Sequence, residues 1–251
     1  MTVQFDVIVV GGGSNSLTTA AYMAKAGKNV LVLEKNKQCG GGAVSREVAP
    51  GFIHDTHATG YSGCIGSPTL TADELGLFSK GGLKFGHWDA MFTTLFDDGT
   101  TLATYKDLDR TCASIAKFSE KDANTYRSFA RKCISLMPLL SAGSANPPLP
   151  TGPFLSLLEG SALGRELANG LFCSAWDVLT HYFESYELRA HYFKWIAEAM
   201  QHPETKGTGI AMYQLLGLAH TMDAVFPVGG GQKLSDALVE AVQRFGGTVR
   251  T

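Results

Sequence analysis

The sequence has no surplus of positive or negative charge and no long apolar run. Each of these two absences excludes a class of protein. Its 21 Lys and Arg residues nearly balance its 23 Asp and Glu residues. Proteins that bind nucleic acid attract phosphates with a basic excess, so we expect no nucleic-acid partner here. No apolar stretch approaches the roughly 18 residues of a membrane span, so no integral membrane segment is expected.

Clustered cysteines are also missing. The five cysteines form no CxxC pair and are spread along the chain: Cys39, Cys64, Cys112, Cys133 and Cys173. Scattered cysteines of odd number suit a reducing compartment better than a disulfide framework, and they predict no metal site. An apolar strand begins almost at the first residue and leaves no room for a signal peptide, so a cytoplasmic protein is expected.

What the sequence has in quantity is glycine, 29 residues in all, and the first cluster lies in a βαβ pattern. The β-branched run at residues 4–10 predicts a buried parallel strand. The glycine turn 11–16 follows it, then a helix of small residues over 17–27 and a second strand over 29–34. A strand, glycine turn, helix and second strand in this order are typical of a dinucleotide-binding site.

The residue types in this unit match the chemistry of a dinucleotide. Gly11 permits a tight turn, and Gly13 lets the backbone approach a pyrophosphate at the N-terminus of the helix. Glu34 ends the second strand, where a carboxylate accepts hydrogen bonds from ribose hydroxyls and disfavours the 2′-phosphate of NADP. Ser16 replaces the third glycine of the motif, and we expect it to shift the helix slightly outward.

A second glycine cluster follows directly after the acid. In a plain NAD domain a third strand or a crossover helix would come soon after Glu34, but here the triplet Gly40–Gly42 predicts a loop near the pyrophosphate. An extended segment with Ser45 and a turn at Pro50–Gly51 come next.

Together the two clusters resemble the FAD-binding fingerprint of the flavin amine oxidase and phytoene desaturase superfamily, most of all its phytoene-dehydrogenase-related oxidoreductases. The matching segments are Gly11–Ser16, Glu34–Lys35, Gly40–Ala43 and Pro50–Asp55. The resemblance implies FAD as the cofactor. The residues expected to bind it in this half of the pattern are Gly11, Gly13, Ser14, Asn15, Ser16, Glu34, Lys35, Gly41, Gly42, Ala43 and Ser45.

The middle of the chain predicts a hairpin followed by helices. Residues 83–105 alternate around Asp97-Asp98-Gly99, a hairpin signal. Residues 107–137 predict two helices, with Ser119 as the N-cap of the second, before a proline-rich loop over 144–153. Residues 163–200 predict further helices. Their aromatic side chains would form either a core or the wall of an apolar cleft: Trp176, Tyr182, Phe183, Tyr192, Phe193 and Trp195.

The resemblance extends to Phe118–Tyr126, to Tyr182–Leu188 and to the segment from Gly217 onward, which resembles the family's return to the nucleotide domain. It implies a role near the flavin for Gly229 and Gly230, and residues 233–245 predict a helix. The fold class implied is α/β, with a Rossmann-like FAD-binding domain of the glutathione-reductase type and an inserted α+β substrate domain. The expected division is residues 1–60 for the FAD-binding βαβ unit, 61–225 for the substrate domain and 226–251 for the return.

The implied activity is an FAD-dependent oxidation that removes a hydride from a C–H bond of an apolar or aromatic small molecule. His57, in the loop after the second glycine cluster, is a candidate base or orienting group because its pKa range suits proton transfer. His220 is a second candidate. Two alternatives stay open: an NAD-dependent dehydrogenase, and a non-catalytic scaffold or escort protein like the GDP dissociation inhibitors.

The last residues, Phe245–Thr251, read as the exit of a helix followed by the first residues of a third strand. In the resembled family a second half follows this strand and completes both domains. We therefore expect an open sheet with exposed apolar residues, and a complementary polypeptide that carries the carboxy-terminal half of the fold, either as a separate subunit or as the rest of a longer protein.

Overall fold

The computed structural model describes residues 4–198 and 200–251, which form two compact units. The first unit contains the chain up to Trp88 together with Ala224–Thr251, and the second contains Asp89–Asp223. The second unit is thus inserted into the first. The expected division placed the first border after residue 60, whereas the compact unit continues to Trp88 because the strand before it pairs with the returning chain.

A parallel three-stranded sheet forms the centre of the first unit. It contains β1 (Val7–Val10), β2 (Val30–Leu33) and β9 (Thr248–Arg250), in the order β1-β2-β9. Val7 pairs with Val30, and Val32 pairs with Val249. The short strand at the end of the sequence is therefore the third strand of the sheet, as the pattern predicted.

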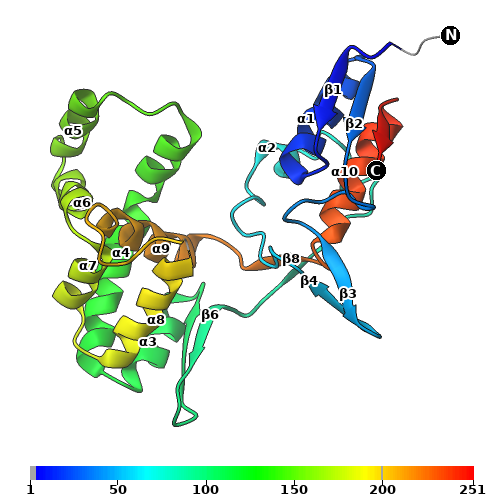
Figure 1. The fold of residues 1–251 in the computed structure, drawn as a ribbon. Helices are drawn as coiled ribbons and strands as arrows, with labels where there is room; N and C mark the ends of the chain where they lie inside the picture. The colour runs from blue at the N-terminus through cyan, green and yellow to red at the C-terminus, as the bar shows by residue number, and fades with distance from the viewer. Residues whose placement is uncertain (1–3, 199) are drawn as a thin grey trace. The chain divides into compact units, whose positions relative to one another are not determined.

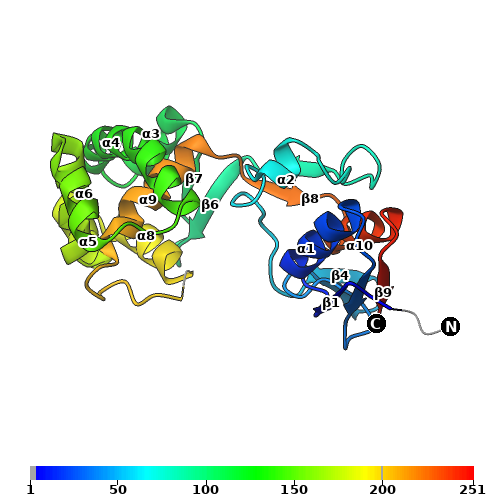
Figure 2. The ribbon, with the colours of Figure 1, turned by 90° about the horizontal axis from the view of Figure 1, so that it is seen from above.

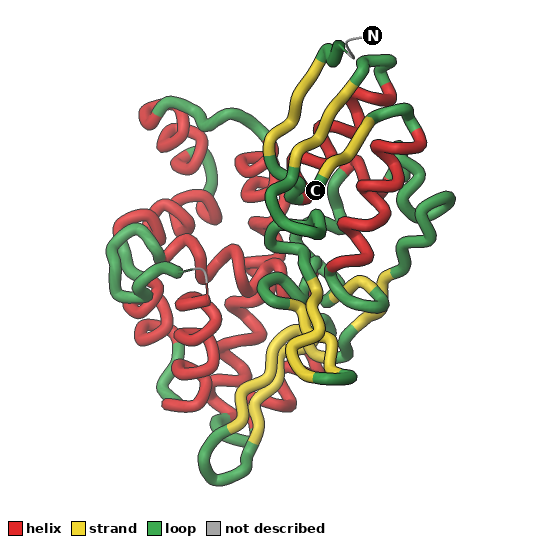
Figure 3. The backbone as a smooth tube through the Cα atoms, turned by 45° about the vertical axis from the view of Figure 1, so that its right-hand side comes forward, coloured by secondary structure: helices red, strands yellow, loops and turns green. Residues whose placement is uncertain are grey.

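Two helices cover one face of this sheet. Figures 1 and 2 show α1 (Ser14–Lys25) and α10 (Gln232–Arg244) side by side, and Figure 3 shows them beside the three strands. The small residues of α1 are buried in this contact, which lets the two helices approach closely. The other face is partly open: Ile8 of β1 is 57% exposed and Val10 is 81% exposed, whereas Leu31 of β2, which pairs with Ile8, is buried.

Two further strand pairs and a short helix complete the first unit. The antiparallel pair β3 (Ser45–Ala49) and β4 (Phe52–Asp55) follows the second glycine cluster, and α2 (Pro68–Thr71) comes after it. The next strand, β5 (Phe85–His87), pairs with β8 (Val225–Pro227) of the returning chain. The prediction of a single hairpin over residues 83–105 is therefore wrong for β5, whose partner lies far away in the sequence.

The second unit begins with the hairpin that the Asp97-Asp98-Gly99 turn predicted. It joins β6 (Ala90–Leu95) to β7 (Thr101–Tyr105). Two helices follow, α3 (Leu108–Ala116) and α4 (Glu120–Ala145). The Ser119 hydroxyl accepts a hydrogen bond of 3.0 Å from the Asp122 N–H, so the predicted N-cap is confirmed.

Five more helices complete the second unit: α5 (Thr151–Glu159), α6 (Ala162–Phe172), α7 (Ala175–Tyr182), α8 (Tyr186–Glu198) and α9 (Gly209–Thr221). The predicted loop over 144–153 is shorter than expected. Helix α4 continues past Pro138, which lies on its exposed side, and α5 starts at Thr151. Only the proline-rich residues 146–150 lie outside a helix.

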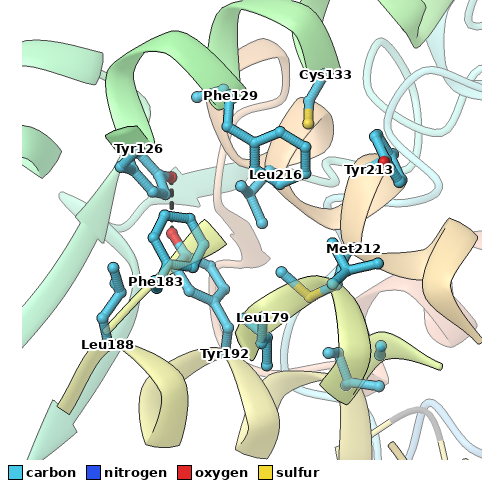
Figure 4. Close-up of a cluster of buried hydrophobic side chains, with 14 of the residues drawn as sticks. Tyr126, Phe129, Cys133, Leu179, Phe183, Leu188, Tyr192, Met212, Tyr213 and Leu216 are labelled. Carbon is cyan, nitrogen blue, oxygen red and sulfur yellow. Dashed lines mark hydrogen bonds between the residues drawn. The ribbon is translucent and has the colours of Figure 1, made fainter. Parts of the chain in front are cut away.

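The core of the second unit is aromatic (Figure 4). Tyr126, Phe129, Phe183 and Tyr192 are its largest fully buried side chains. The core interpretation of the aromatic pattern is confirmed for Phe183 and Tyr192. The other four members of that pattern are partly buried against the same cluster.

In the described part of the chain, no helix is long and apolar enough to cross a membrane. The five cysteines are free, and no group of three or more potential metal ligands occurs among the described residues.

Candidate dinucleotide-binding site

The glycine turn between β1 and α1 forms the centre of the candidate site. Gly11 has a φ of +98°, a conformation that side chains disfavour, and its N–H donates to the Leu33 carbonyl at 2.7 Å. Gly13 is the N-cap residue of α1, and no side chain caps this helix. The turn thus leaves the start of α1 free of protein acceptors.

The first turn of α1 is a cradle for an anion. The backbone N–H groups of Ser14, Asn15 and Ser16 have no acceptor among the described residues, because the first helical hydrogen bond runs from Leu17 to Gly13. No acidic residue lies in this turn, and no atom of the described residues lies within 4 Å of the position that a Cβ on Gly13 would take. Free amides and the positive end of a helix dipole facing open space fit a pyrophosphate.

Glu34 lies directly beside this turn. Its Oε2 accepts a hydrogen bond of 2.7 Å from the Gly12 N–H, and its Oε1 accepts from the backbone and side-chain amides of Asn36. The hydrogen bonds from the N–H groups of Asn36 and Gly12 lower the pKa of the carboxyl group. Glu34 is therefore a fixed anion near the glycine turn, where the ribose of a bound dinucleotide would need an acceptor.

The second glycine cluster packs against the first. The Gly40 N–H donates to the Gly12 carbonyl at 2.7 Å, and a Cβ on Gly41 would lie 3.1 Å from the Gly13 Cα. Behind the turn, a Cβ on Gly12 would lie 2.6 Å from the Cys39 sulfur. Glycine permits these close approaches without a shift of the neighbouring atoms, so the two clusters form one surface of backbone.

The returning chain closes this surface from a third side. The Ser45 hydroxyl donates to Asp55 Oδ1 at 2.6 Å, and the same oxygen accepts from the Gly231 N–H at 2.8 Å. Gly230 has a φ of +92°, and a Cβ there would lie 2.5 Å from the Ser45 hydroxyl. The predicted residues Ser45 and Gly230 are thus in contact, although 185 positions separate their numbers (230 − 45).

The first turn of α10 holds the second glycine loop in place. The Gln232 side chain donates to the Cys39 carbonyl at 3.0 Å, and the Ser235 hydroxyl donates to the Ala43 carbonyl at 2.9 Å. Neither Gln232 nor Ser235 is among the predicted site residues, because nothing in the local sequence indicates such a distant partner. Asp55 appears in the sequence analysis only as the last residue of the matching segment Pro50–Asp55, without a predicted role in the site.

The remaining predicted residues have less defined surroundings. Lys35 is exposed beside Glu34, and in the described part of the chain no atom lies within 4 Å of the position that a Cβ on Gly42 would take. Gly229 has a φ of +92° and contacts the aliphatic part of Lys233.

A pocket of about 500 Å³ opens beside the first turn of α1. Ser14 and Asn15 line it together with Tyr61, whose pKa burial raises to about 12. Its opposite wall is apolar, with Leu234 and Leu238 of α10. The pocket gives a ligand at the helix N-terminus room to continue along the protein.

The two candidate catalytic histidines belong to different units. His57, in the first unit, is exposed, and its Nδ1 lies 2.9 Å from the Thr56 hydroxyl. His220, in the second unit, uses both ring nitrogens: Nε2 lies 2.8 Å from the Tyr126 hydroxyl and Nδ1 lies 3.1 Å from the Lys106 carbonyl. With both nitrogens engaged, the geometry favours a structural role for His220.

Comparison with known proteins agrees with this geometry. The model of the NAD(P)-binding Rossmann-like domain family matches residues 9–72. Pyridine nucleotide-disulfide oxidoreductase domain-containing protein 2 of Mus musculus is 30% identical over 283 residues, an alignment that covers 99% of this chain and 47% of the relative. A limonene dehydrogenase subunit of Castellaniella defragrans is 37% identical over 124 residues, which cover 49% of this chain and 22% of the relative.

Among solved structures, cyclohexylamine oxidase from Brevibacterium oxydans is similar with a TM-score of 0.58 at 18% identity. The match covers 98% of this chain and 51% of that one, and at this identity it shows the fold alone. The chain therefore spans about half the length, or less, of the proteins that it matches.

Proposed function

The chain carries an NAD(P)/FAD-binding Rossmann domain of the amine oxidase and phytoene desaturase-like family, and we propose that this domain binds FAD. One observation carries the choice of FAD over NAD: the second glycine loop packs directly on the glycine turn, with Gly41 against Gly13. A plain NAD site has no need of this second loop, whereas the adjacent pocket gives space for a longer cofactor.

The residues present fit such a cofactor. The free N–H groups of Ser14, Asn15 and Ser16 would bind its pyrophosphate, and Glu34 would accept from the ribose hydroxyls. The cofactor supplies the capacity to accept a hydride. The protein's own part is to bind and orient it through backbone amides, which do not titrate.

The reaction we propose is hydride removal from a C–H bond of an apolar or aromatic small molecule, in the class of desaturation or of amine or alcohol oxidation. The limonene dehydrogenase relative, whose name specifies a hydrocarbon substrate, supports this class. His57 is the proposed base or orienting group, since its ring is exposed and its Nε2 has no partner among the described residues.

The Gly13→Val substitution tests FAD binding. Gly13 has a φ of −74°, which any residue adopts, and a Cβ there meets no atom of residues 4–198 or 200–251 within 4 Å. Valine should therefore fold normally while filling the space assigned to the pyrophosphate. We expect the purified wild-type chain to bind FAD with flavin absorbance and quenched fluorescence, and the variant to bind it at least about 100-fold more weakly.

Gly66→Val is the matched control, because Gly66 belongs to the same unit and also has open space around its Cβ position. Both variants should keep the circular dichroism spectrum of the wild type. Titration with NAD in place of FAD tests the main alternative. Tight NAD binding without FAD binding, or FAD binding unaffected by Gly13→Val, would contradict the proposal.

We further propose that a second polypeptide segment, from the same or another chain, covers the open face of the sheet. Exposed apolar side chains on β1 and on the β3–β4 hairpin support this, including Val10 at 81% and Ile53 at 71% exposure. Patches of this kind on soluble proteins commonly mark interfaces. Co-purification with a chain that resembles the other half of these relatives would support it, and a monodisperse, flavin-loaded monomer of these 251 residues would contradict it.

A further inference from the structure

A second, larger pocket lies wholly within the inserted unit. Its volume is about 730 Å³, and it opens between the end of α4, the residues that follow it, α5, α6 and α9. Leu158 and Leu167, both almost fully buried, contribute to its wall, and the more exposed Pro147, Leu149 and Leu157 lie toward solvent. The volume is within the range of about 300–1,000 Å³ that is common for small-molecule sites.

The pocket lining is aliphatic and uncharged. Among the described residues, no Asp, Glu, Lys, Arg or His lines it, and Phe154 is its only aromatic residue. Two amides are present. That of Asn146 donates to the Ala142 carbonyl at 2.8 Å, whereas the Gln214 side chain forms no hydrogen bond with another described residue. Among the described residues, the lining thus offers apolar contact and two amides, of which that of Gln214 has neither its nitrogen nor its oxygen engaged.

Glycines hold the walls of this pocket at fixed positions. A Cβ on Gly164 of α6 would lie 2.1 Å from the Leu158 carbonyl oxygen, so the backbones of α5 and α6 are in direct contact. Similarly, a Cβ on Gly209 of α9 would lie 2.7 Å from the Gly170 carbonyl oxygen of α6. These close backbone contacts keep α5, α6 and α9 from moving closer together, so these three helices cannot fill the pocket from their side.

The geometry points to a binding site for a neutral aliphatic small molecule that carries a single hydroxyl or carbonyl group. The apolar wall binds the carbon skeleton, and Gln214 forms a hydrogen bond with the polar group. A carboxylate or ammonium group would lose its hydration without finding a countercharge, so the site discriminates against charged chains of the same length. The pocket shares no lining residue with the dinucleotide site, and its test needs no flavin.

Titration of the whole chain with primary alcohols tests the proposal, with displacement of the neutral dye Nile red as the readout. Each added methylene should tighten binding about fourfold until the cavity is full. Decanoate and decylammonium, which have the same chain length as decanol, should bind at least about tenfold more weakly. The absence of saturable binding, or equal affinity for the three decyl compounds, would overturn the proposal.

Three substitutions locate the binding site. Ile210→Trp fills the cavity, Leu157→Asp places a charge at its half-exposed rim, and each should weaken decanol binding at least about tenfold. Gln214→Leu removes the hydrogen bond and should weaken it about fivefold. Leu95→Asp is the matched control, because Leu95 is 72% exposed in the same unit and lies outside the pocket.

Leu157→Asp keeps the test decisive if Ile210→Trp fails to fold. Leu157 is already 51% exposed, so a charge there should not prevent folding. Decanol binding that Leu157→Asp leaves unchanged would overturn the assignment. So would a wild-type chain that self-associates through this face, binds no alcohol and becomes monomeric in Leu157→Asp, because the occupant would then be a second copy.

Discussion

The hydroxyl of Tyr192 donates a hydrogen bond of 2.7 Å to the hydroxyl of Tyr126 in the centre of the second unit (Figure 4). Tyr126 in turn lies 2.8 Å from His220 Nε2, so the direction of donation makes that nitrogen an acceptor and leaves Nδ1–H to donate to the Lys106 carbonyl. On its other side, Tyr192 lies 3.0 Å from the Thr104 hydroxyl. A polar chain thus joins α8, α4 and α9 through an otherwise apolar core.

Replacing Tyr126 by Phe should destabilise the protein without disturbing its shape. The change leaves His220 Nε2 without a donor and deprives the Tyr192 hydroxyl of its acceptor, so the free energy of unfolding should fall by about 1–3 kcal/mol. Urea denaturation followed by circular dichroism measures it. Tyr186→Phe, at a residue 75% exposed, is the control and should stay within about 0.5 kcal/mol of the wild type.

Acid should destabilise the second unit through His191. This side chain is fully buried between the hydroxyls of Thr94 and Thr104, and burial lowers its pKa from 6.5 to about 3. Between these two pH values the unfolded chain binds a proton that the folded chain excludes. The contribution of neutral His191 to stability is therefore complete above the pKa of this side chain in the unfolded state, and it is lost as the pH falls toward the pKa in the folded state.

Between about pH 7 and about pH 4, this one group should remove on the order of 3 kcal/mol from the free energy of unfolding. Because carboxylates also titrate in acid, the measured quantity is the difference in pH dependence between the wild type and His191→Gln. His202→Gln, at an exposed site, should retain the wild-type slope. A wild-type curve parallel to that of His191→Gln would contradict the assignment.

Removing the charge of Glu34 should weaken FAD binding. In Glu34→Gln the carboxylate that accepts from Gly12 and would accept from the ribose becomes an amide, so affinity should fall at least about tenfold. Since the pKa of Glu34 is already lowered, binding by the wild type should not change between about pH 6 and about pH 8. Fluorescence titration with FAD gives both results, with Glu240→Gln on the surface of α10 as the control.

Asp122 should be among the most sensitive polar positions of the second unit. It is fully buried, and its carboxylate accepts hydrogen bonds from the backbone N–H groups of Glu184 at 3.0 Å and of Ser185 at 2.7 Å, at the start of α8. Asp122→Ala removes the acceptor of both N–H groups and leaves a void at a buried position, so it should lower the free energy of unfolding by about 2–4 kcal/mol. Asp97→Ala, in the exposed hairpin turn, should have an effect below about 0.5 kcal/mol.

Local patterns predicted the local elements well. The glycine turn, the acid after β2, the Asp97-Asp98-Gly99 hairpin and the Ser119 N-cap all depend on residues a few positions apart. Their geometry follows from φ preferences and capping chemistry, which the sequence displays directly. The same holds for the aromatic core, where helical spacing indicates burial.

The features that sequence reasoning missed are contacts between distant residues. Nothing near β5 indicates that it pairs with β8, and so the expected border of the first unit lies too early. Likewise, nothing near Gln232 indicates the Cys39 carbonyl, and His220 is a catalytic candidate in the sequence only because its two partners lie far from it along the chain. Such contacts depend on the packing of whole elements.

The pairing of β5 with β8 has a consequence for how the protein can be altered and how it could have evolved. Just beyond the paired strands, the Trp88 N–H donates to the Ala224 carbonyl at 2.9 Å, so the chain leaves and re-enters the first unit at neighbouring points. The first unit therefore imposes almost no length requirement on the segment inserted between Trp88 and Ala224. A different module, or a linker of a few residues, could replace Asp89–Asp223 while the nucleotide-binding scaffold keeps its connectivity.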